Sequence, residues 1–238
     1  MPDVAAADWL LADGPLAVLV SGGLDSAILL GEAVRTGRET WPLYVRCGFH
    51  WEAVELDHLR RFLDAIKLEW PAARLHGLQA LDMPVGDLYP RHWSLTGQGV
   101  PAADSPDEAV FLPGRNILLL AKAMLWCHLH GVTALALAPL ATNPFADATE
   151  KFFRAFEAAV NEGIGGAVRV LRPYASLHKP DVMRRGAGFP VALTFSCIRP
   201  VRGRHCGRCN KCAERRRAFA EAQMADPTAY AAEESCTA

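Results

Sequence analysis

The sequence lacks a segment that is both long enough and apolar enough to cross a membrane. Its longest apolar stretch, residues 117–141, is interrupted by Lys122, His128 and His130, whereas a membrane helix needs about 20 mostly apolar residues. The first eight residues hold no basic group ahead of an apolar segment, so a secretory signal is not expected. These absences favour a cytoplasmic protein with no membrane partner and with reduced thiols.

The chain also lacks repeated units, low-complexity tracts and an excess of charge of either sign. Its 25 Lys and Arg residues nearly balance 26 Asp and Glu residues, which gives a formal net charge of −1. Stable binding of nucleic acid is therefore not expected, since it requires a basic surface. Residues 199–217 are locally basic. They form either a solvated face or a site for an anionic nucleotide or substrate.

Segments typical of strands and helices alternate along the chain. Apolar runs predict strands at residues 16–20, 41–46, 73–78 and 133–138. Helical spacing predicts helices at residues 27–35, 52–66, 117–130, 148–162, 179–185 and 213–223. This alternation predicts an α/β fold with a parallel sheet, and 238 residues suffice for one large domain with a small appendage.

A glycine-rich loop, Ser21-Gly22-Gly23-Leu24-Asp25-Ser26, joins the first predicted strand to the first predicted helix. Its glycines allow backbone N–H groups to face a bound anion at a helix N-terminus, which predicts a phosphate site. No Lys-Ser or Lys-Thr pair follows Gly23, so this is not a Walker A loop. Asp25 beside a phosphate is costly unless a cation intervenes, which suggests Mg²⁺. The alternative is an ordinary turn capped by Asp25 or Ser26.

Four cysteines near the C-terminus have the spacing of a metal site: Cys197, Cys206, Cys209 and Cys212. Four thiolates favour tetrahedral Zn²⁺ with a closed, structural coordination shell. They also suit an iron–sulfur cluster, which the sequence alone does not exclude. Of the other cysteines, we expect Cys47 and Cys127 to be buried small hydrophobes and Cys236 to be free.

Residues 79–113 do not continue the alternation of strands and helices. They form a connection that is longer than loops without a function usually are. Tyr89, His92, Trp93 and Ser94 are candidates to line a pocket there, although ordinary packing is the better explanation for any one of them taken alone. Arg115 and Asn116 then begin a predicted helix. A cation is slightly disfavoured at a helix N-terminus, so an anionic partner is expected nearby.

The glycine-rich loop closely resembles the PP-loop of the ATP pyrophosphatases, which cleave ATP between the α- and β-phosphates. Further motifs resemble one family in particular, 7-cyano-7-deazaguanine synthase of the queuosine precursor pathway. They are residues 112–116, 178–181, 194–197, 206–212 and 226–230. The resemblance implies a doubly wound parallel sheet of the adenine nucleotide alpha hydrolase type with a small zinc-binding knob. It divides the chain into a PP-loop domain, residues 1–190, and a zinc-binding segment, residues 191–238, packed on it as one compact unit.

The resemblance also implies a reaction. ATP adenylates the carboxylate of 7-carboxy-7-deazaguanine, ammonia attacks to give an amide, and a second ATP dehydrates the amide to the nitrile. ATP, Mg²⁺ and Zn²⁺ are the implied cofactors, the deazapurine acid and ammonia the partners, and a homodimer is expected from the family alone.

Residue roles carry over by position. The catalytic set is Asp25, Ser26, Lys179 and Arg115, and the ATP-binding set is Leu19, Val20, Ser21, Gly22, Gly23, Leu24, Asp25, Ser26, Arg115 and Asn116. Cys197, Cys206, Cys209 and Cys212 hold zinc. We also assign His50, Trp93 and Asp147 to the substrate side.

Two segments, residues 46–52 and 138–148, depart from the family pattern. The chain therefore fits either a synthase or a divergent relative that acts on another acid or attaches a deazapurine to protein in phage defence. A PP-loop tRNA sulfur transferase is a further alternative, with Cys47 as its early thiol. A non-enzyme alternative is a zinc-ribbon regulator that binds nucleic acid through residues 199–217.

Overall fold

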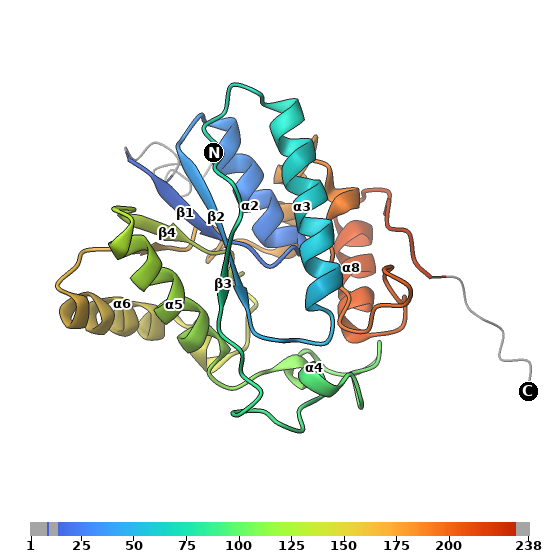
Figure 1. Cartoon of the computed structure of the whole chain (residues 1–238). Coiled ribbons are helices and arrows are strands. Elements are labelled where there is room, and N and C mark those ends of the chain that lie inside the picture. Colours follow the sequence, from blue (N-terminus) through green and yellow to red (C-terminus); the bar gives the residue numbers. More distant parts are fainter. Residues whose placement is uncertain (1–8, 10–13, 232–238) are drawn as a thin grey trace, which may run out of the picture.

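The computed structural model describes residue 9 and residues 14–231; Cys236 and the N-terminal segment considered above lie outside these residues. Five parallel strands form one sheet in the order β3-β2-β1-β4-β5 (Figure 1). The strands are β1 Leu16–Leu19, β2 Thr40–Arg46, β3 Gln79–Asp82, β4 Ala134–Ala136 and β5 Arg169–Leu171. The predicted parallel α/β fold is confirmed.

The chain direction across the sheet reverses at β1. Leu16 of β1 is in register with Thr40 of β2 on one side and with Ala134 of β4 on the other. In such sheets, a crevice opens beyond the carboxyl ends of the strands where the order reverses. The glycine-rich loop follows β1 directly, so the fold places it at this position.

Helices cover both faces of the sheet. They are α2 Leu24–Arg35, α3 Glu52–Glu69, α4 Trp93–Thr96, α5 Arg115–Leu129, α6 Glu150–Ile164, α7 Lys179–Arg185 and α8 Asn210–Glu221, with short 3₁₀ turns η2 Asp107–Val110, η3 Ala146–Ala148 and η4 Val191–Leu193. Figure 1 shows α5 and α6 on one side of the sheet and α2, α3 and α8 on the other. In the described part of the chain, none of these helices has the length and apolar character needed to span a membrane.

Each face of the sheet has its own core, because successive strand side chains point to opposite faces. Leu16 and Val18 of β1 pack with α2, α3, α7 and α8. Ala17, between them, packs with α5 and α6. Phe219 of α8 is 1% exposed within the first core. The C-terminal helix is therefore anchored on the main domain, while a boundary at residue 190 stays a prediction.

One predicted strand needs correction, and one strand, β5, was not predicted. Residues 73–78 were expected to form the third strand, but β3 begins at Gln79 and pairs with β2 from Leu43 onward. Leu75 makes an isolated bridge to Thr40, so the preceding segment only approaches the sheet. β5 has three residues, one of them the exposed Arg169. It is an edge strand and only partly buried, so it lacks the apolar run that predicts the equally short β4.

The long segment after β3 packs against the end of β2 and the cysteine-rich region. Ala102 bridges to Cys209, and the Asn210 side chain donates to the carbonyl of Ser105 at 2.8 Å. Val85 and Leu112 share a buried cluster with Phe195 and Cys197. This segment therefore holds the four-cysteine region against the sheet.

Candidate functional site

The glycine-rich loop closes on itself at the N-terminus of α2. The Ser26 hydroxyl accepts a hydrogen bond from the Ser21 amide at 3.1 Å and lies 3.3 Å from the Gly23 carbonyl. Gly23 is the N-cap residue and supplies no side chain, so neither Asp25 nor Ser26 caps the helix. The first amides of α2 are left facing outward. This is the geometry expected of an anion site.

Gly22 has to be glycine for two reasons. Its φ of +74° lies in the left-handed region, and a Cβ built there would come 3.0 Å from Cγ of Glu55. Gly22 therefore lets α3 approach the loop from behind. It is a structural member of the loop, whereas its neighbours face the cavity described next.

A cavity of about 300 Å³ opens in front of the loop. Its walls come from the loop, the end of β2, and the starts of α3, α5, α7 and α8. Most of the sequence-predicted residues line it: Leu19, Val20, Ser21, Gly23, Leu24, Asp25, Ser26, Arg115, Asn116 and Lys179. The structure thus brings together residues that are up to 160 positions apart in the sequence.

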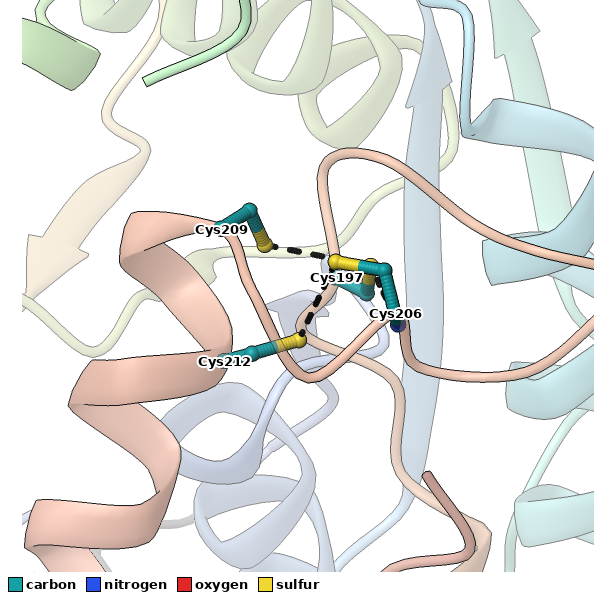
Figure 2. Close-up of side chains that lie close together, drawn as sticks. All are labelled: Cys197, Cys206, Cys209 and Cys212. Atoms are coloured by element: carbon teal, nitrogen blue, oxygen red, sulfur yellow. Dashed lines mark hydrogen bonds between the residues drawn. The ribbon is translucent and has the colours of Figure 1, made fainter. Parts of the chain in front are cut away.

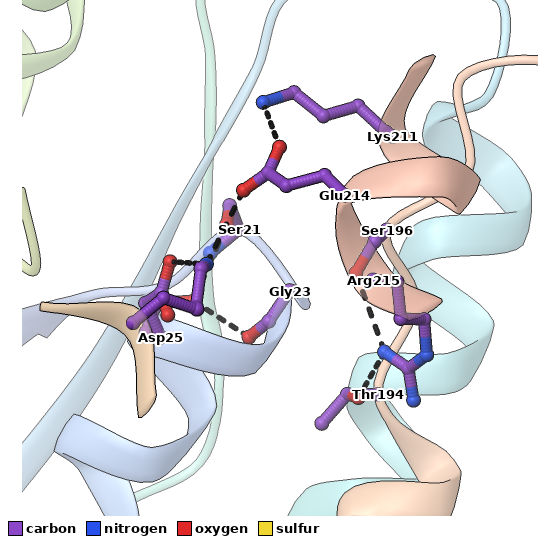
Figure 3. Close-up of polar contacts among 10 residues, drawn as sticks. Ser21, Gly23, Asp25, Thr194, Ser196, Lys211, Glu214 and Arg215 are labelled. Atoms are coloured by element: carbon purple, nitrogen blue, oxygen red, sulfur yellow. Dashed lines mark hydrogen bonds and ion pairs between the residues drawn. The ribbon is translucent and has the colours of Figure 1, made fainter. Parts of the chain in front are cut away.

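Lys179 connects the loop to α8. Its Nζ lies 2.6 Å from Oδ2 of Asp25 and 3.3 Å from Oε1 of Glu214. Figure 3 shows Lys211 beside Glu214, where Lys211 donates to Oε2 of Glu214 at 2.6 Å. Burial alone lowers the pKa of Lys179, but the Asp25 and Glu214 carboxylates outweigh it and raise the pKa. Burial works against ionisation of Glu214 too, yet Lys211 and Lys179 lower its pKa to about 2. Lys179 and Glu214 are therefore both charged at neutral pH.

Asp25 keeps one oxygen free for a ligand. Its Oδ1 is buried and has no hydrogen-bond partner within residues 14–231, while Oδ2 is taken by Lys179. An unpaired buried carboxylate oxygen is costly. A divalent cation at the cavity would supply the missing partner, so this residue fits Mg²⁺.

α5 begins with Arg115 and Asn116, as predicted. The two side chains have different surroundings. The Arg115 guanidinium lies over the Phe49 ring, 5.5 Å from its centroid, and its Nε is buried without a hydrogen-bond partner in the described residues. Asn116 is held by Asp147, which accepts from its backbone and side-chain amides at 2.9 Å each. Asp147 lies outside the cavity lining and orients Asn116.

The aromatic wall of the cavity consists of residues adjacent to those selected from the sequence. Phe49 and Trp51 line it and stack with ring centroids 5.0 Å apart. Trp93 stacks on the far side of Trp51 at 5.7 Å and lies outside the lining. His50 is exposed and packs against Gly97, also outside the lining. The direction of the turn before α3 determines which neighbours face inward.

Two cavity residues that sequence reasoning missed are Tyr44 and Glu55. The Tyr44 hydroxyl donates to Oε2 of Glu55, which is 8% exposed. Burial raises the pKa of Glu55 to about 7, in spite of this hydrogen bond. A carboxyl group that titrates near neutral pH in a cavity is typical of a functional position.

Arg215 and Lys211 bring the basic stretch into the site. Arg215 is 1% exposed and donates to Thr194 at 2.8 Å and to Ser196 at 3.3 Å. It is the exception in the stretch, because the six other arginines are exposed: Arg199, Arg202, Arg204, Arg208, Arg216 and Arg217. At Lys211 and Arg215 the stretch lines the cavity, which supports the interpretation that it holds an anion.

The four cysteines form a compact cluster at the start of α8 (Figure 2). Their Sγ atoms lie within 4.8 Å of one another, with Cys197 and Cys209 at 3.8 Å and Cys206 and Cys212 at 3.9 Å. A tetrahedral ion with metal–sulfur bonds of about 2.3 Å requires sulfurs about 3.8 Å apart. The backbone amides of Arg199 and Cys206 donate to the Cys197 sulfur at 3.3 Å each, which favours thiolate. The cluster fits a single zinc ion.

The remaining described cysteines, Cys47 and Cys127, are buried as predicted, at 2% and 0% exposure. Burial raises the pKa of the Cys47 thiol to about 11 and that of Cys127 to about 12. Both are protonated at neutral pH. They behave as small apolar side chains.

A solved structure described as a crystal structure of a 4-thiouridine synthetase–RNA complex with bound ATP aligns with this fold at a TM-score of 0.49 and 15% identity. The alignment covers 91% of this chain and 47% of that one, so this chain spans about half its length.

Sequence comparisons extend over nearly the whole chain. The 7-cyano-7-deazaguanine synthase of Azoarcus sp. (strain BH72) is 34% identical over 235 residues, which cover 93% of this chain and 100% of the relative. The synthase of Anaeromyxobacter dehalogenans (strain 2CP-C) is 32% identical over 233 residues, which cover 90% and 94%. The model of the family described as queuosine biosynthesis protein QueC matches residues 16–223. This chain therefore belongs to the enzyme family of the queuosine biosynthesis protein QueC.

Proposed function

We propose that this chain is a 7-cyano-7-deazaguanine synthase that works by two successive adenylations. The observation that carries the proposal is the match to a curated synthase over 100% of that relative's length. The cavity supports it, because an anion-binding loop, an aromatic wall and several charged groups face one space. In the reaction we propose, ATP activates the carboxylate of 7-carboxy-7-deazaguanine, ammonia displaces AMP, and a second ATP dehydrates the resulting amide.

The phosphate end of the site is formed by the loop and α7. The outward-facing amides of α2 and the Ser26 hydroxyl would bind phosphate oxygens, and Lys179 would offset the charge that develops on pyrophosphate. Asp25 would hold Mg²⁺, which when bound neutralises phosphate charge. No residue of the chain has to act as a nucleophile. The protein's task is to align the acid with the α-phosphate and to exclude water.

The aromatic end of the site is suited to a flat heterocycle. Phe49 and Trp51 offer a stacking surface, and Tyr44 and Glu55 offer polar groups at its base. Arg115 would contact a carboxylate or phosphate, since its guanidinium carries an unpaired buried Nε. Residues 46–52, which depart from the family pattern, include Phe49 and Trp51. The departure therefore affects the aromatic wall that would contact the base.

The metal centre has a structural role in this proposal. Zn²⁺ bound by four thiolates has no open position for catalysis. It would hold the start of α8, from which Lys211, Glu214 and Arg215 reach the cavity. A cytoplasmic location and a homodimer, the latter expected from the family resemblance, belong to the same proposal.

Two of the alternatives are disfavoured by particular residues. Sulfur transfer requires a reactive thiol, but Cys47 is 2% exposed and its pKa is raised to about 11. A regulator that binds nucleic acid through residues 199–217 would use the six exposed arginines of this stretch, but Lys211 and Arg215 of the same stretch line the cavity instead. A relative that acts on another acid remains the alternative to be separated by experiment.

The test is pyrophosphate release by the purified, zinc-loaded protein with Mg-ATP and ammonium. We expect release that depends on 7-carboxy-7-deazaguanine and does not occur with unrelated carboxylic acids. Release with a different acid and none with the deazapurine would replace the substrate while keeping the adenylation chemistry. No release with any acid, together with normal ATP binding, would contradict the enzymatic proposal.

A further inference from the structure

Four side chains of alternating charge form a row across the cavity, from the glycine-rich loop to α8. In order they are Asp25, Lys179, Glu214 and Lys211, with successive contacts of 2.6, 3.3 and 2.6 Å. Asp25 comes from the start of α2, Lys179 from the start of α7, and the last two from α8. All four line the cavity in front of the loop.

Glu214 lies between the two lysines of this row, because each of its carboxylate oxygens contacts a different lysine. Oε1 contacts Lys179 and Oε2 accepts from Lys211. One carboxylate bridging two ammonium groups makes contacts that two oxygens of a phosphate would also make. The cavity thus contains an internal anion at a place where the proposed function puts phosphate.

The charged side chains of this row have room to exchange partners. Those of Lys179, Glu214 and Lys211 are 17%, 28% and 33% exposed, and all three residues line the cavity. The next residue, Arg215, shows the contrasting case. It is 1% exposed, and its guanidinium is already held by hydrogen bonds to Thr194 and Thr228.

We propose that Glu214 is an internal competitor for phosphate and that Lys211 is an additional phosphate contact. In the absence of ligand, the Glu214 carboxylate holds Lys179 and Lys211. A phosphate of the nucleotide displaces it from the two lysines, and the carboxylate returns to them when pyrophosphate leaves. This inference rests on the proposed ATP site and adds to it a residue that sets nucleotide affinity and product release.

Competition predicts opposite effects for the two α8 residues. Glu214→Gln keeps the shape of the side chain but removes the competing charge, so we expect pyrophosphate to bind about tenfold more tightly, about 1.4 kcal/mol. Lys211→Ala removes a phosphate contact, so we expect about tenfold weaker binding. A merely structural role for Glu214 does not produce tighter binding.

The experiment is calorimetric titration of zinc-loaded full-length protein with pyrophosphate and with a non-cleavable ATP analogue, each with and without Mg²⁺. Glu221→Gln, an exposed glutamate at the other end of α8, is the matched control and should bind like wild type. Zinc content and thermal unfolding show that each variant is folded. In turnover, we expect Glu214→Gln to lower both KM for ATP and kcat, because pyrophosphate leaves more slowly.

Four results would overturn the inference. Glu214→Gln that binds pyrophosphate more weakly would make the carboxylate a supporting part of the site, and weakening seen only with Mg²⁺ would make it a cation ligand. Unchanged binding would mean that no competition exists. Wild-type protein that binds neither probe would contradict the nucleotide site itself and this inference with it. No deazapurine is used, so an error in the proposed acid substrate leaves the result unaffected.

Discussion

The Nζ of Lys179 lies 2.6 Å from Oδ2 of Asp25, although 154 residues separate the two in the chain. Asp25 belongs to the loop after β1, and Lys179 is the first residue of α7. The pair joins the segment after β1, the central strand, to the segment after β5, an edge strand, at one cavity. Its other carboxylate oxygen, Oδ1 of Asp25, is left for a ligand.

Asp25→Asn should impair chemistry far more than folding. The amide keeps the side-chain shape but loses the charge that we assign to Mg²⁺. We expect pyrophosphate release to fall about 100-fold, with the free energy of unfolding changed by about 1 kcal/mol or less. Asp57→Asn, an exposed aspartate paired with Arg61, is the control for stopped-flow pyrophosphate assays and urea titrations. Unchanged turnover in Asp25→Asn would make Asp25 a structural residue only.

Gly22→Ala should disturb the loop through both backbone strain and close contact. A left-handed φ costs a non-glycine residue about 1–2 kcal/mol, and the new Cβ would come 3.0 Å from Glu55. Gly37 has a similar φ of +78° but nothing within 4 Å of the added Cβ, so Gly37→Ala carries the strain alone. We expect Gly22→Ala to be the more destabilised in thermal unfolding and to bind ATP more weakly. Equal effects would mean that the approach of α3 to the loop has no energetic consequence.

Glu55 should make stability depend on pH. Its pKa is raised from 4.5 to about 7 in the folded protein, so between these values the unfolded chain gives up its proton first. Stability attributable to this group is therefore present below about pH 4.5 and is lost as the pH rises to about 7. Relative to wild type, we expect Glu55→Gln to become more stable by about 2 kcal/mol between pH 5 and pH 8. Glu69→Gln, exposed at the end of α3, should show no such change in urea unfolding.

Trp51 and His50 should behave differently although they are adjacent. Loss of a stacking surface costs about 1–3 kcal/mol per base, so Trp51→Leu should raise KM for the deazapurine acid about tenfold or more. His50 lies outside the cavity lining, and His50→Ala should leave KM within about twofold, as usual for surface substitutions. The reverse result would mean that the turn before α3 rearranges when substrate binds.

Cys209→Ser should release the metal and loosen α8. Structural zinc contributes directly to folding free energy, and Cys209 is the N-cap residue of α8. We expect loss of bound zinc, faster amide exchange in α8 and a lower melting temperature. Cys127→Ala, at a buried cysteine outside the cluster, should keep its zinc. Full activity in a metal-free Cys209→Ser protein would show that the enzyme does not need zinc.

The parts of the site that the sequence predicts are those that lie in short motifs. The glycine-rich loop, the four cysteines, and Arg115 and Asn116 at the start of α5 each have a local pattern with a physical reason. Their convergence on one cavity follows from the parallel sheet, because the carboxyl ends of its strands meet at the same edge.

The parts that the sequence does not predict depend on how helices face each other. Glu55 and Glu214 lie on amphipathic helices among other charged residues, and nothing in the spacing separates Glu55 from Glu52 or Asp57. Only the approach of α3 to Gly22 and of α8 to Lys179 makes them cavity residues. The strands β3 and β5 were displaced or missed for a different reason: both lie at the edges of the sheet and are only partly buried, so they lack the apolar runs that predict the equally short β1 and β4.

The central claim is that one cavity uses ATP twice, first to activate the deazapurine acid and then to dehydrate its amide. The most direct measurement is mass spectrometry of the deazapurine formed from 7-carboxy-7-deazaguanine, ¹⁵N-ammonium and Mg-ATP, with AMP counted in the same reaction. Our account predicts the ¹⁵N-labelled nitrile with two AMP per nitrile. A labelled amide with one AMP as the final product, or an unmodified acid while ATP is bound normally, would contradict it.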